Sequence, residues 1–219
     1  NISPLDSRYA NKISELRENF SESALIKIRF DIEIEWLLYI CVNLPKTFKP
    51  LSKQSIKKIT KFKDSFDNKS VLKIKKIEST TNHDVKAVEY YIRDYFLKDK
   101  VLSTYTHLIH FGLTSEDINS LSYAHMIKNG IFIYVKELDK VNKILKNYSK
   151  KWAKQPFLAR THGQAASPST LGKEFKVFHE RINKEMQHLK SIKPLAKFSG
   201  ATGNYHTFDI VDSKLNWIK

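Results

Sequence analysis

The sequence has few of the residues that crosslink or interrupt a chain. Its 219 residues include one cysteine, Cys41, together with six glycines and six prolines. A single cysteine excludes an internal disulfide, and with no secretory pattern in the sequence it predicts a cytoplasmic protein in a reducing compartment. The scarcity of glycine and proline favours long helices over an all-β fold.

Several familiar sequence signals are also missing. No apolar run approaches the roughly 20 residues that a membrane-spanning helix needs. The sequence contains no zinc pattern, no phosphate loop and no dinucleotide-binding fingerprint. We therefore expect no membrane partner, and the common zinc and phosphate-loop protein classes are excluded.

Acidic residues are scarce, with 23 Asp and Glu against 38 Lys and Arg, so that the formal net charge is +15. Such an excess suggests an anionic partner, which could be nucleic acid, an acidic membrane surface or a phosphorylated metabolite. The excess is mostly lysine, whereas bidentate recognition of phosphate favours arginine. Residues 46–76 hold eleven lysines against two aspartates. We interpret this region as a solvated surface of helices and loops, and a polyanion-binding patch is the alternative.

Residues 21–42 carry two conflicting signals. Apolar and charged side chains alternate along part of this segment, which is typical of a strand. The segment is too long for a common strand, however, and Lys27 with Asp31 and Arg29 with Glu33 have the i,i+4 spacing of helical ion pairs. We therefore predict a buried helix over these residues.

Further helices are predicted from apolar residues spaced three and four apart. These helices cover residues 84–97, 114–153 and 168–192. Residues 80–83 are expected in a loop before the first of them. A capping box at Thr114 begins the second, and Ser167 caps the third with Pro168 at its first position.

The helix over residues 114–153 is the longest predicted element. About 40 residues at 1.5 Å each span roughly 60 Å, and such a rod needs partners along its length. The expected fold is all-α, with an N-terminal helical domain over residues 1–112. Residues 113–219 would form the first long helices of a central up-and-down helical bundle, which we expect to assemble between subunits.

Four polar clusters lie at the predicted helix boundaries. At such places, side chains and backbone amides can converge on a ligand. Histidine can donate a proton near neutral pH, hydroxyls at a helix start can bind a carboxylate or phosphate, and arginine can bind a phosphate through two hydrogen bonds. The clusters are residues 3–9 (SPLDSRY), 80–84 (TTNHD), 110–117 (HFGLTSED) and 160–164 (RTHGQ).

Each cluster also has an ordinary structural explanation. His83 can belong to a capped helix start, and Thr114 begins a common capping pattern. Arg8 and Tyr9 can be surface residues, and His162 can be a hydrogen-bonding residue of a loop. The remaining histidines are interpreted as structural or exposed: His107, His125, His179, His188 and His206.

Taken together and in this order, the clusters resemble the fumarase/aspartase superfamily and, within it, the adenylosuccinate lyases. Residues 80–85 resemble the Asn-His-Asp motif of these enzymes, and residues 114–119 resemble their Thr-Ser-Glu-Asp motif. Residues 160–174 resemble their catalytic-histidine motif, and residues 199–205 their following glycine turn. Other superfamily members have Thr-His-Leu-Gln where this chain has Thr-His-Gly-Gln.

The resemblance implies a lyase of purine nucleotide biosynthesis. Such enzymes release fumarate by β-elimination from adenylosuccinate, giving AMP, and from a succinyl-carboxamide ribotide, SAICAR, giving AICAR. The implied general acid is His162, and His83 would orient the substrate beside it. The other implied substrate-binding residues are Arg8, Tyr9, Asn82, Asp84, Thr114, Ser115 and Gln164.

The resemblance also implies which part of the substrate each of these residues binds. Arg8 and Tyr9 would bind the nucleotide phosphate, and Thr114 and Ser115 the succinyl part, while the role of His110 is left open. No metal or organic cofactor is implied. The implied partner is a second copy of the chain, in a homotetramer with shared active sites, and not a nucleic acid or a membrane.

One family motif is missing from the sequence. These lyases carry their catalytic base in a Gly-Ser-Ser-x-Met-Pro-x-Lys-x-Asn loop, which does not occur among the 219 residues. We therefore expect an N-terminal fragment that is inactive alone. The alternatives are a basic helical module that binds RNA or another polyanion, and an inactive structural fragment.

Overall fold

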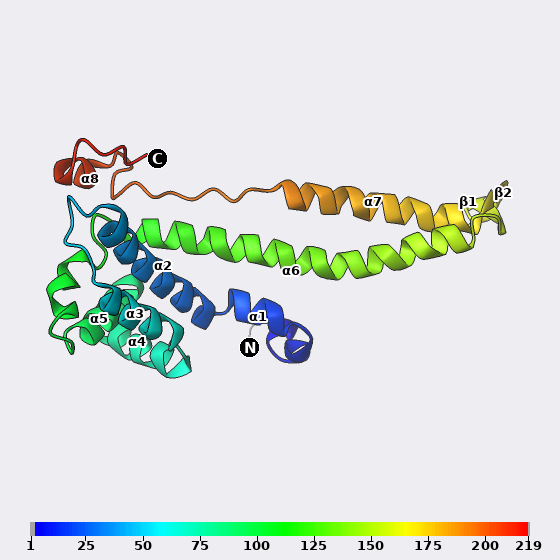
Figure 1. Ribbon diagram of the computed structural model, residues 1–219. Coiled ribbons are helices and arrows are strands. Elements are labelled where there is room, and N and C mark those ends of the chain that lie inside the picture. Colours follow the sequence, from blue (N-terminus) through cyan, green and yellow to red (C-terminus); the bar gives the residue numbers. More distant parts are fainter. Residues whose placement is uncertain (1–2, 219) are drawn as a thin grey trace. The chain divides into compact units, whose positions relative to one another are not determined.

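The structure is a computed structural model that describes residues 3–218, and it is mostly helical (Figure 1). This confirms the predicted helical fold class. The α-helices are α1 (Ser14–Phe20), α2 (Glu22–Asn43), α3 (Lys53–Asp64), α4 (Asn68–Thr81), α5 (Asp84–Phe96), α6 (Ser115–Lys151), α7 (Leu171–Ser191) and α8 (His206–Val211). Short 3-10 helices cover Pro4–Asp6, Ala10–Lys12 and Leu102–Leu108, and β1 (Pro156–Thr161) pairs with β2 (Gln164–Thr170).

The chain forms two compact units. The first unit contains the described residues up to Met126 and those from Leu195 onward, and the second unit contains Ile127–Pro194. Helix α6 contributes residues to both. The domain boundary expected at residue 112 stays a prediction. Among the described residues, no helix is long and apolar enough to cross a membrane.

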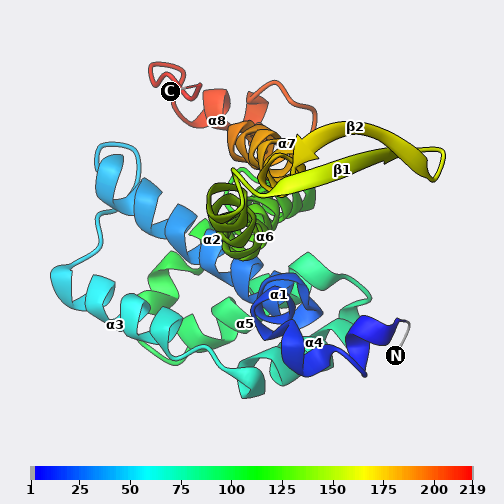
Figure 2. The same ribbon diagram turned by 90° about the vertical axis from the view of Figure 1, so that its right-hand side faces the viewer.

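Helix α2 forms the centre of the first unit, where Figure 2 shows it beside α3, α4 and α5. Ser21 caps it by accepting a hydrogen bond from the amide of Ala24, and Lys27 pairs with Asp31 at 2.5 Å. The predicted helix is therefore confirmed, and the strand that the alternating pattern indicated is not formed. Apolar side chains of α2 are buried on several sides: Ile26, Phe30, Ile34, Leu37, Ile40 and Cys41.

The lysine-rich region folds as predicted, into the surface helices α3 and α4 with short connections. Ile59, Phe62 and Ile74 are buried against the core, whereas most of the lysines face solvent. The loop predicted over residues 80–83 is wrong in part, because α4 continues through Thr81. Asn82 ends α4 in the left-handed conformation (φ 51°), which a helix C-terminus commonly requires.

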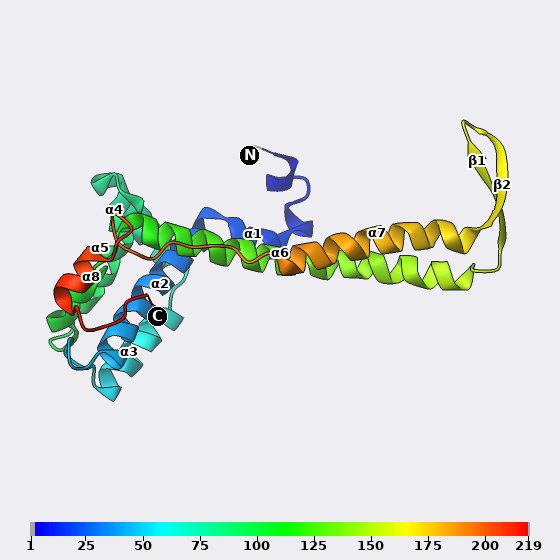
Figure 3. The same ribbon diagram turned by 90° about the horizontal axis from the view of Figure 1, so that it is seen from above.

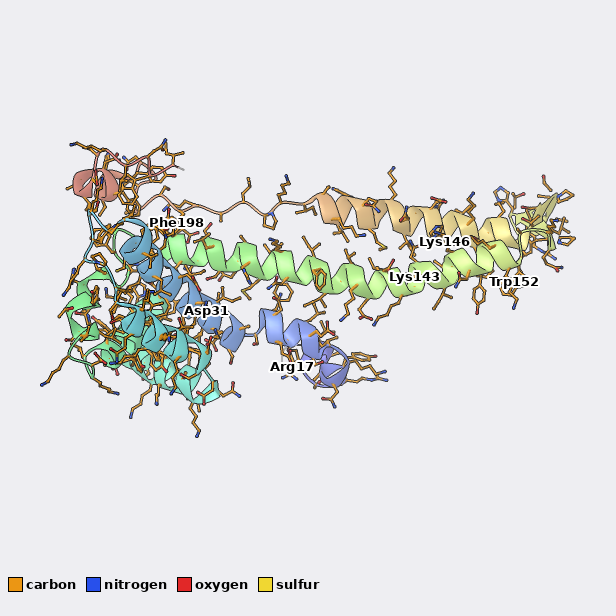
Figure 4. The ribbon with its side chains drawn as sticks, in the orientation of Figure 1. Arg17, Asp31, Lys143, Lys146, Trp152 and Phe198 are labelled. Atoms are coloured by element: carbon orange, nitrogen blue, oxygen red, sulfur yellow. The ribbon has the colours of Figure 1, made fainter. Side chains whose placement is uncertain are left out.

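In the second unit, the C-terminal part of α6 and the helix α7 lie side by side and are joined by the β1–β2 hairpin (Figures 1 and 3). Trp152, labelled in Figure 4, packs against Tyr148 and Phe175. A Cβ added to Gly172 would lie 2.4 Å from the carbonyl oxygen of Ser149. Only a glycine therefore allows α7 to begin so close to α6.

The hairpin corrects the predicted start of the third long helix. Thr170, not Ser167, caps α7 by accepting a hydrogen bond from the amide of Lys173, and Ser167 and Pro168 lie in β2. Proline is tolerated there because a strand of a two-stranded hairpin has a free edge. The two-residue turn is His162-Gly163, with both φ angles positive, as such turns require.

Candidate functional site

The candidate site lies in the first unit, where α5 begins beside the start of α6. His83 is the N-cap of α5: its Nδ1 atom accepts a hydrogen bond of 3.2 Å from the amide of Lys86. That bond fixes the ring and leaves Nε2 for other partners, and the hydroxyl of Ser115 lies 3.4 Å from it. The structural and the ligand-binding interpretations of His83 are thus compatible.

An open pocket of about 520 Å³ surrounds these two residues. It unites the second and third polar clusters, residues 80–84 and 110–117, which 25 residues separate in the sequence. Its wall includes the Lys86 ammonium, which is paired with Glu89, and the hydroxyls of Thr114 and Ser115, and such donors suit an anionic ligand. The lining residues are Thr81, His83, Lys86, Glu89, Tyr90, His110, Leu113, Thr114 and Ser115.

Asp84 has a structural contact that the sequence did not suggest. Its carboxylate pairs with the guanidinium of Arg29 at 2.7 Å and accepts a hydrogen bond from the amide of Val85. Burial alone would raise the pKa of Asp84, but the Val85 amide and the Arg29 charge together hold that pKa below its ordinary value. Asp84 is not among the residues that line the pocket.

His110 lies between two carboxylates at the pocket. Its Nδ1 atom is 2.6 Å from Oε1 of Glu33, and its Nε2 atom is 3.8 Å from Oε1 of Glu89. Burial works against the charged ring, but the hydrogen bond to Glu33 and the charges of both glutamates raise the pKa of His110 overall. Burial also raises the pKa of Glu33, against the opposing effect of His110.

The start of α6 is held by Asp117, which is fully buried. Its carboxylate accepts hydrogen bonds from the amides of Thr114 (2.9 Å), Ser199 (2.9 Å) and Gly200 (3.1 Å). The Thr114 bond is one half of the predicted capping box. The glycine turn that follows residue 198 is thereby fastened to the helix start that lines the pocket.

The other sequence-predicted residues lie elsewhere. In the described part of the N-terminal segment, the guanidinium of Arg8 lies 5.4 Å from the ring centre of Tyr9, and both side chains are exposed. His162 and Gln164 belong to the second unit, where they are exposed at the hairpin. The pocket in the first unit therefore holds the predicted binding residues His83, Thr114 and Ser115 but not the predicted acid.

Sequence reasoning did not find the partners of the buried charges. The i,i+4 pair expected between Arg29 and Glu33 is wrong, because Arg29 pairs with Asp84. Glu33 is instead hydrogen-bonded to His110. Arg29 and Glu33 are buried on α2, and Glu89 is buried on α5. A signal was available, because charged side chains within a helix predicted to be buried must find partners. Among residues 3–218, no group of three or more His, Cys, Asp and Glu side chains is arranged to hold a metal ion.

Comparisons with known proteins agree with the helical fold. A family model described as Lyase matches residues 7–216. The adenylosuccinate lyase of Buchnera aphidicola subsp. Schizaphis graminum is 39% identical over 99% of this chain and 48% of that protein. The adenylosuccinate lyase of Dictyostelium discoideum is 39% identical, and that of Escherichia coli K12 is 37% identical. Each of these two alignments covers 99% of this chain and 48% of the relative.

Solved structures show the same fold at lower identity. A fumarate lyase from Mesorhizobium sp. BNC1 matches with a TM-score of 0.72 at 20% identity, over 89% of this chain and 44% of that one. A 3-carboxy-cis,cis-muconate lactonizing enzyme from Pseudomonas putida matches with a TM-score of 0.69 at 18% identity, over 88% and 42%. The chain spans about half the length of the curated relatives it matches. Because the family model covers residues 7–216, the chain belongs to this lyase family, the fumarase/aspartase superfamily.

Proposed function

We propose that this chain is part of an adenylosuccinate lyase, which releases fumarate from adenylosuccinate and from SAICAR. The observation that carries the proposal is the pocket where His83 meets Ser115, since it unites two of the motifs that resemble those enzymes. The similarity to adenylosuccinate lyases over 99% of the chain supports the same substrate class.

In the proposed reaction, a base removes a proton next to a succinyl carboxylate, and an acid protonates the departing nitrogen. The carbanion formed between these steps needs fixed hydrogen-bond donors. The hydroxyls of Thr114 and Ser115 at the start of α6 are suited to the succinyl carboxylate, because helix N-termini favour anions. His83 would orient the substrate through its Nε2 atom.

His162 is the proposed general acid. It is exposed at the turn of the β1–β2 hairpin, where its φ of 50° is held by a tight turn. Binding and catalytic residues are often exposed on loops that regular elements position. Gln164 follows at the start of β2, and Arg8 and Tyr9 are the proposed phosphate-binding residues.

A homo-oligomer, and specifically a tetramer with shared active sites, is part of the proposal. Its support is the apolar surface that the two long helices of the second unit leave uncovered. An exposed apolar stripe along a helix favours burial against another helix. The exposed side chains at seven-residue spacing on α6 are Ile127, Tyr134, Val141 and Tyr148, and Ile144 lies beside them.

The experiment is an absorbance assay for adenylosuccinate cleavage by the protein that the complete reading frame encodes. Substituting His162→Ala should lower kcat at least about a hundredfold, which is the usual contribution of a general acid. His188→Ala is the matched control, because His188 is also exposed but lies on α7. Turnover of the His162→Ala variant equal to that of the control would refute the acid assignment.

The polyanion-binding alternative has weaker support. Three lysines of residues 46–76 are neutralised by ion pairs: Lys58 with Asp99 at 2.5 Å, Lys63 with Glu35, and Lys75 with Glu22 at 2.7 Å. If the alternative were right, the chain would bind single-stranded RNA with a steep dependence on salt. Absence of binding at low salt would dispose of it.

A further inference from the structure

Glu33 has no accessible surface on its side chain, although it is a carboxylate. Its Oε1 atom is bonded to Nδ1 of His110 at 2.6 Å, and its Oε2 atom is buried without a hydrogen-bond partner. A buried carboxylate with one unpaired oxygen lowers the stability of a fold. Packing alone therefore does not explain why a glutamate is buried at this position. Its hydrogen bond to His110 does explain it, if Glu33 acts on that ring.

The surroundings of His110 are rich in charge. Glu33 approaches it from α2, and Glu89 and Lys86 approach it from α5, where the Lys86 ammonium binds Oε2 of Glu89 at 2.8 Å. His83, at the start of α5, lines the same pocket. The strongest of these contacts to the His110 ring is the 2.6 Å bond to Glu33, because the Glu89 oxygen lies 3.8 Å away.

The two ring nitrogens of His110 have different surroundings. Nδ1 is directed to a carboxylate that no solvent reaches, while the ring itself lines the open pocket. A histidine that donates one ring N–H to a carboxylate keeps a fixed tautomer and a fixed orientation. Nε2 is then the nitrogen left for a ligand.

We propose that Glu33 is the positioning residue of His110: it accepts the Nδ1 hydrogen, keeps the ring protonated, and so makes Nε2–H the hydrogen-bond donor available to an anionic oxygen in the pocket. The raised pKa of His110 is consistent with this role. The inference rests on the proposed function only for the identity of the ligand, which would be an anionic group of the substrate.

The test is nuclear magnetic resonance of this chain labelled with ¹⁵N-histidine, without any ligand. The His110 ring signals are assigned by their loss in a His110→Gln variant and followed between about pH 5 and pH 9. We expect Nδ1 to stay protonated over the whole range. In Glu33→Gln, the side chain can still accept a hydrogen bond but has lost its charge, so that the midpoint of the His110 titration should fall by about one pH unit or more.

Glu35→Gln is the matched control, because Glu35 lies on the same helix but is exposed and pairs with Lys63. It should leave the midpoint unchanged. If Nδ1 of His110 is unprotonated at high pH in the wild-type protein, that observation alone would overturn the proposal. An unchanged midpoint in Glu33→Gln, or the same fall in Glu35→Gln, would overturn it as well.

Turnover gives a second readout that separates this inference from the proposed function. In the protein that the complete reading frame encodes, Glu33→Gln should shift the alkaline limb of the kcat/KM profile to lower pH by about the same amount as the ring titration. If no adenylosuccinate is cleaved at all, the proposed function fails while the ring titration still decides the role of Glu33. An active Glu33→Gln variant with an unshifted profile would overturn the role.

Discussion

The ammonium of Lys197 lies 2.7 Å from the carboxylate of Asp117, although 80 residues separate them in the sequence. The same ammonium also donates to the carbonyl oxygen of Gly200. Together with the Ser199 and Gly200 amides, these bonds attach the segment after α7 to the first turn of α6. A single buried side chain thus connects the candidate pocket to the glycine turn.

Replacing this carboxylate by an amide should destabilise the first unit. In Asp117→Asn, the charge opposite Lys197 is lost and one acceptor becomes a donor that faces backbone amides. We expect the free energy of unfolding to fall by about 2–3 kcal/mol. Urea denaturation followed by tryptophan fluorescence measures it, because Trp36 and Trp217 both pack on Phe208 of this unit. Asp139→Asn, at an exposed pair with Lys143, should leave the curve unchanged, and equal effects would contradict the anchoring role.

Two glycines with similar backbone angles should respond differently to alanine. Gly112 (φ +72°) would place a Cβ 2.4 Å from the Phe208 ring, whereas at Gly203 (φ +81°) the nearest atom is 3.8 Å away. Both variants carry the cost of a positive φ, about 1 kcal/mol. Gly112→Ala should lose a further 1–3 kcal/mol or so from overpacking. Thermal unfolding of the two variants gives the comparison, and similar losses would show that the ring moves aside freely.

His83 has a structural role that can be separated from its chemistry. Asparagine is a good N-cap and can replace the hydrogen bond to the Lys86 amide, whereas alanine cannot. We expect His83→Ala to lose about 1 kcal/mol of stability and His83→Asn to lose little. Urea unfolding distinguishes the two. In the active protein both variants should be impaired, so that a fully active His83→Asn would refute substrate orientation by the imidazole.

The Glu33–His110 pair should make stability depend on pH. Both pKa values are raised in the fold, from ordinary values of 4.5 and 6.5. The folded state therefore holds more protons than the unfolded chain, and stability falls as pH rises. For His110, the stabilisation is fully present below about pH 6.5 and is lost as pH rises through the folded pKa. Each group contributes a slope of at most about 1.4 kcal/mol per pH unit.

Unfolding free energies at two pH values on either side of neutrality measure this slope. Glu33→Gln removes one titrating group and also the carboxylate whose hydrogen bond contributes most to raising the pKa of His110. Its free energy of unfolding should therefore fall less with rising pH than that of the wild type. Subtracting one slope from the other removes the contributions of the other histidines, which both proteins share. If the free energy of unfolding fell more steeply with pH in Glu33→Gln than in the wild type, the prediction would be contradicted.

The sequence by itself determined the helical elements whose signals are local. Side-chain spacing and the absence of breakers predicted α2, α5 and α6 to within a few residues. These signals are reliable because a helix is built from contacts three and four residues apart. The motifs around His83 and Thr114 were visible for the same reason, since each includes its own helix start.

Only the tertiary structure decided which residues meet. It replaced the first turn predicted for the last long helix by a strand, because Pro168 pairs across from Leu158 and the turn is formed by His162 and Gly163. That turn lacks the usual Asn-Gly or Asp-Gly signal. The structure also assigned partners to buried charges such as Glu33 and Asp117, whose contacts lie 77 and more than 80 residues away in the chain. Such pairings depend on how helices pack, and no local pattern encodes them.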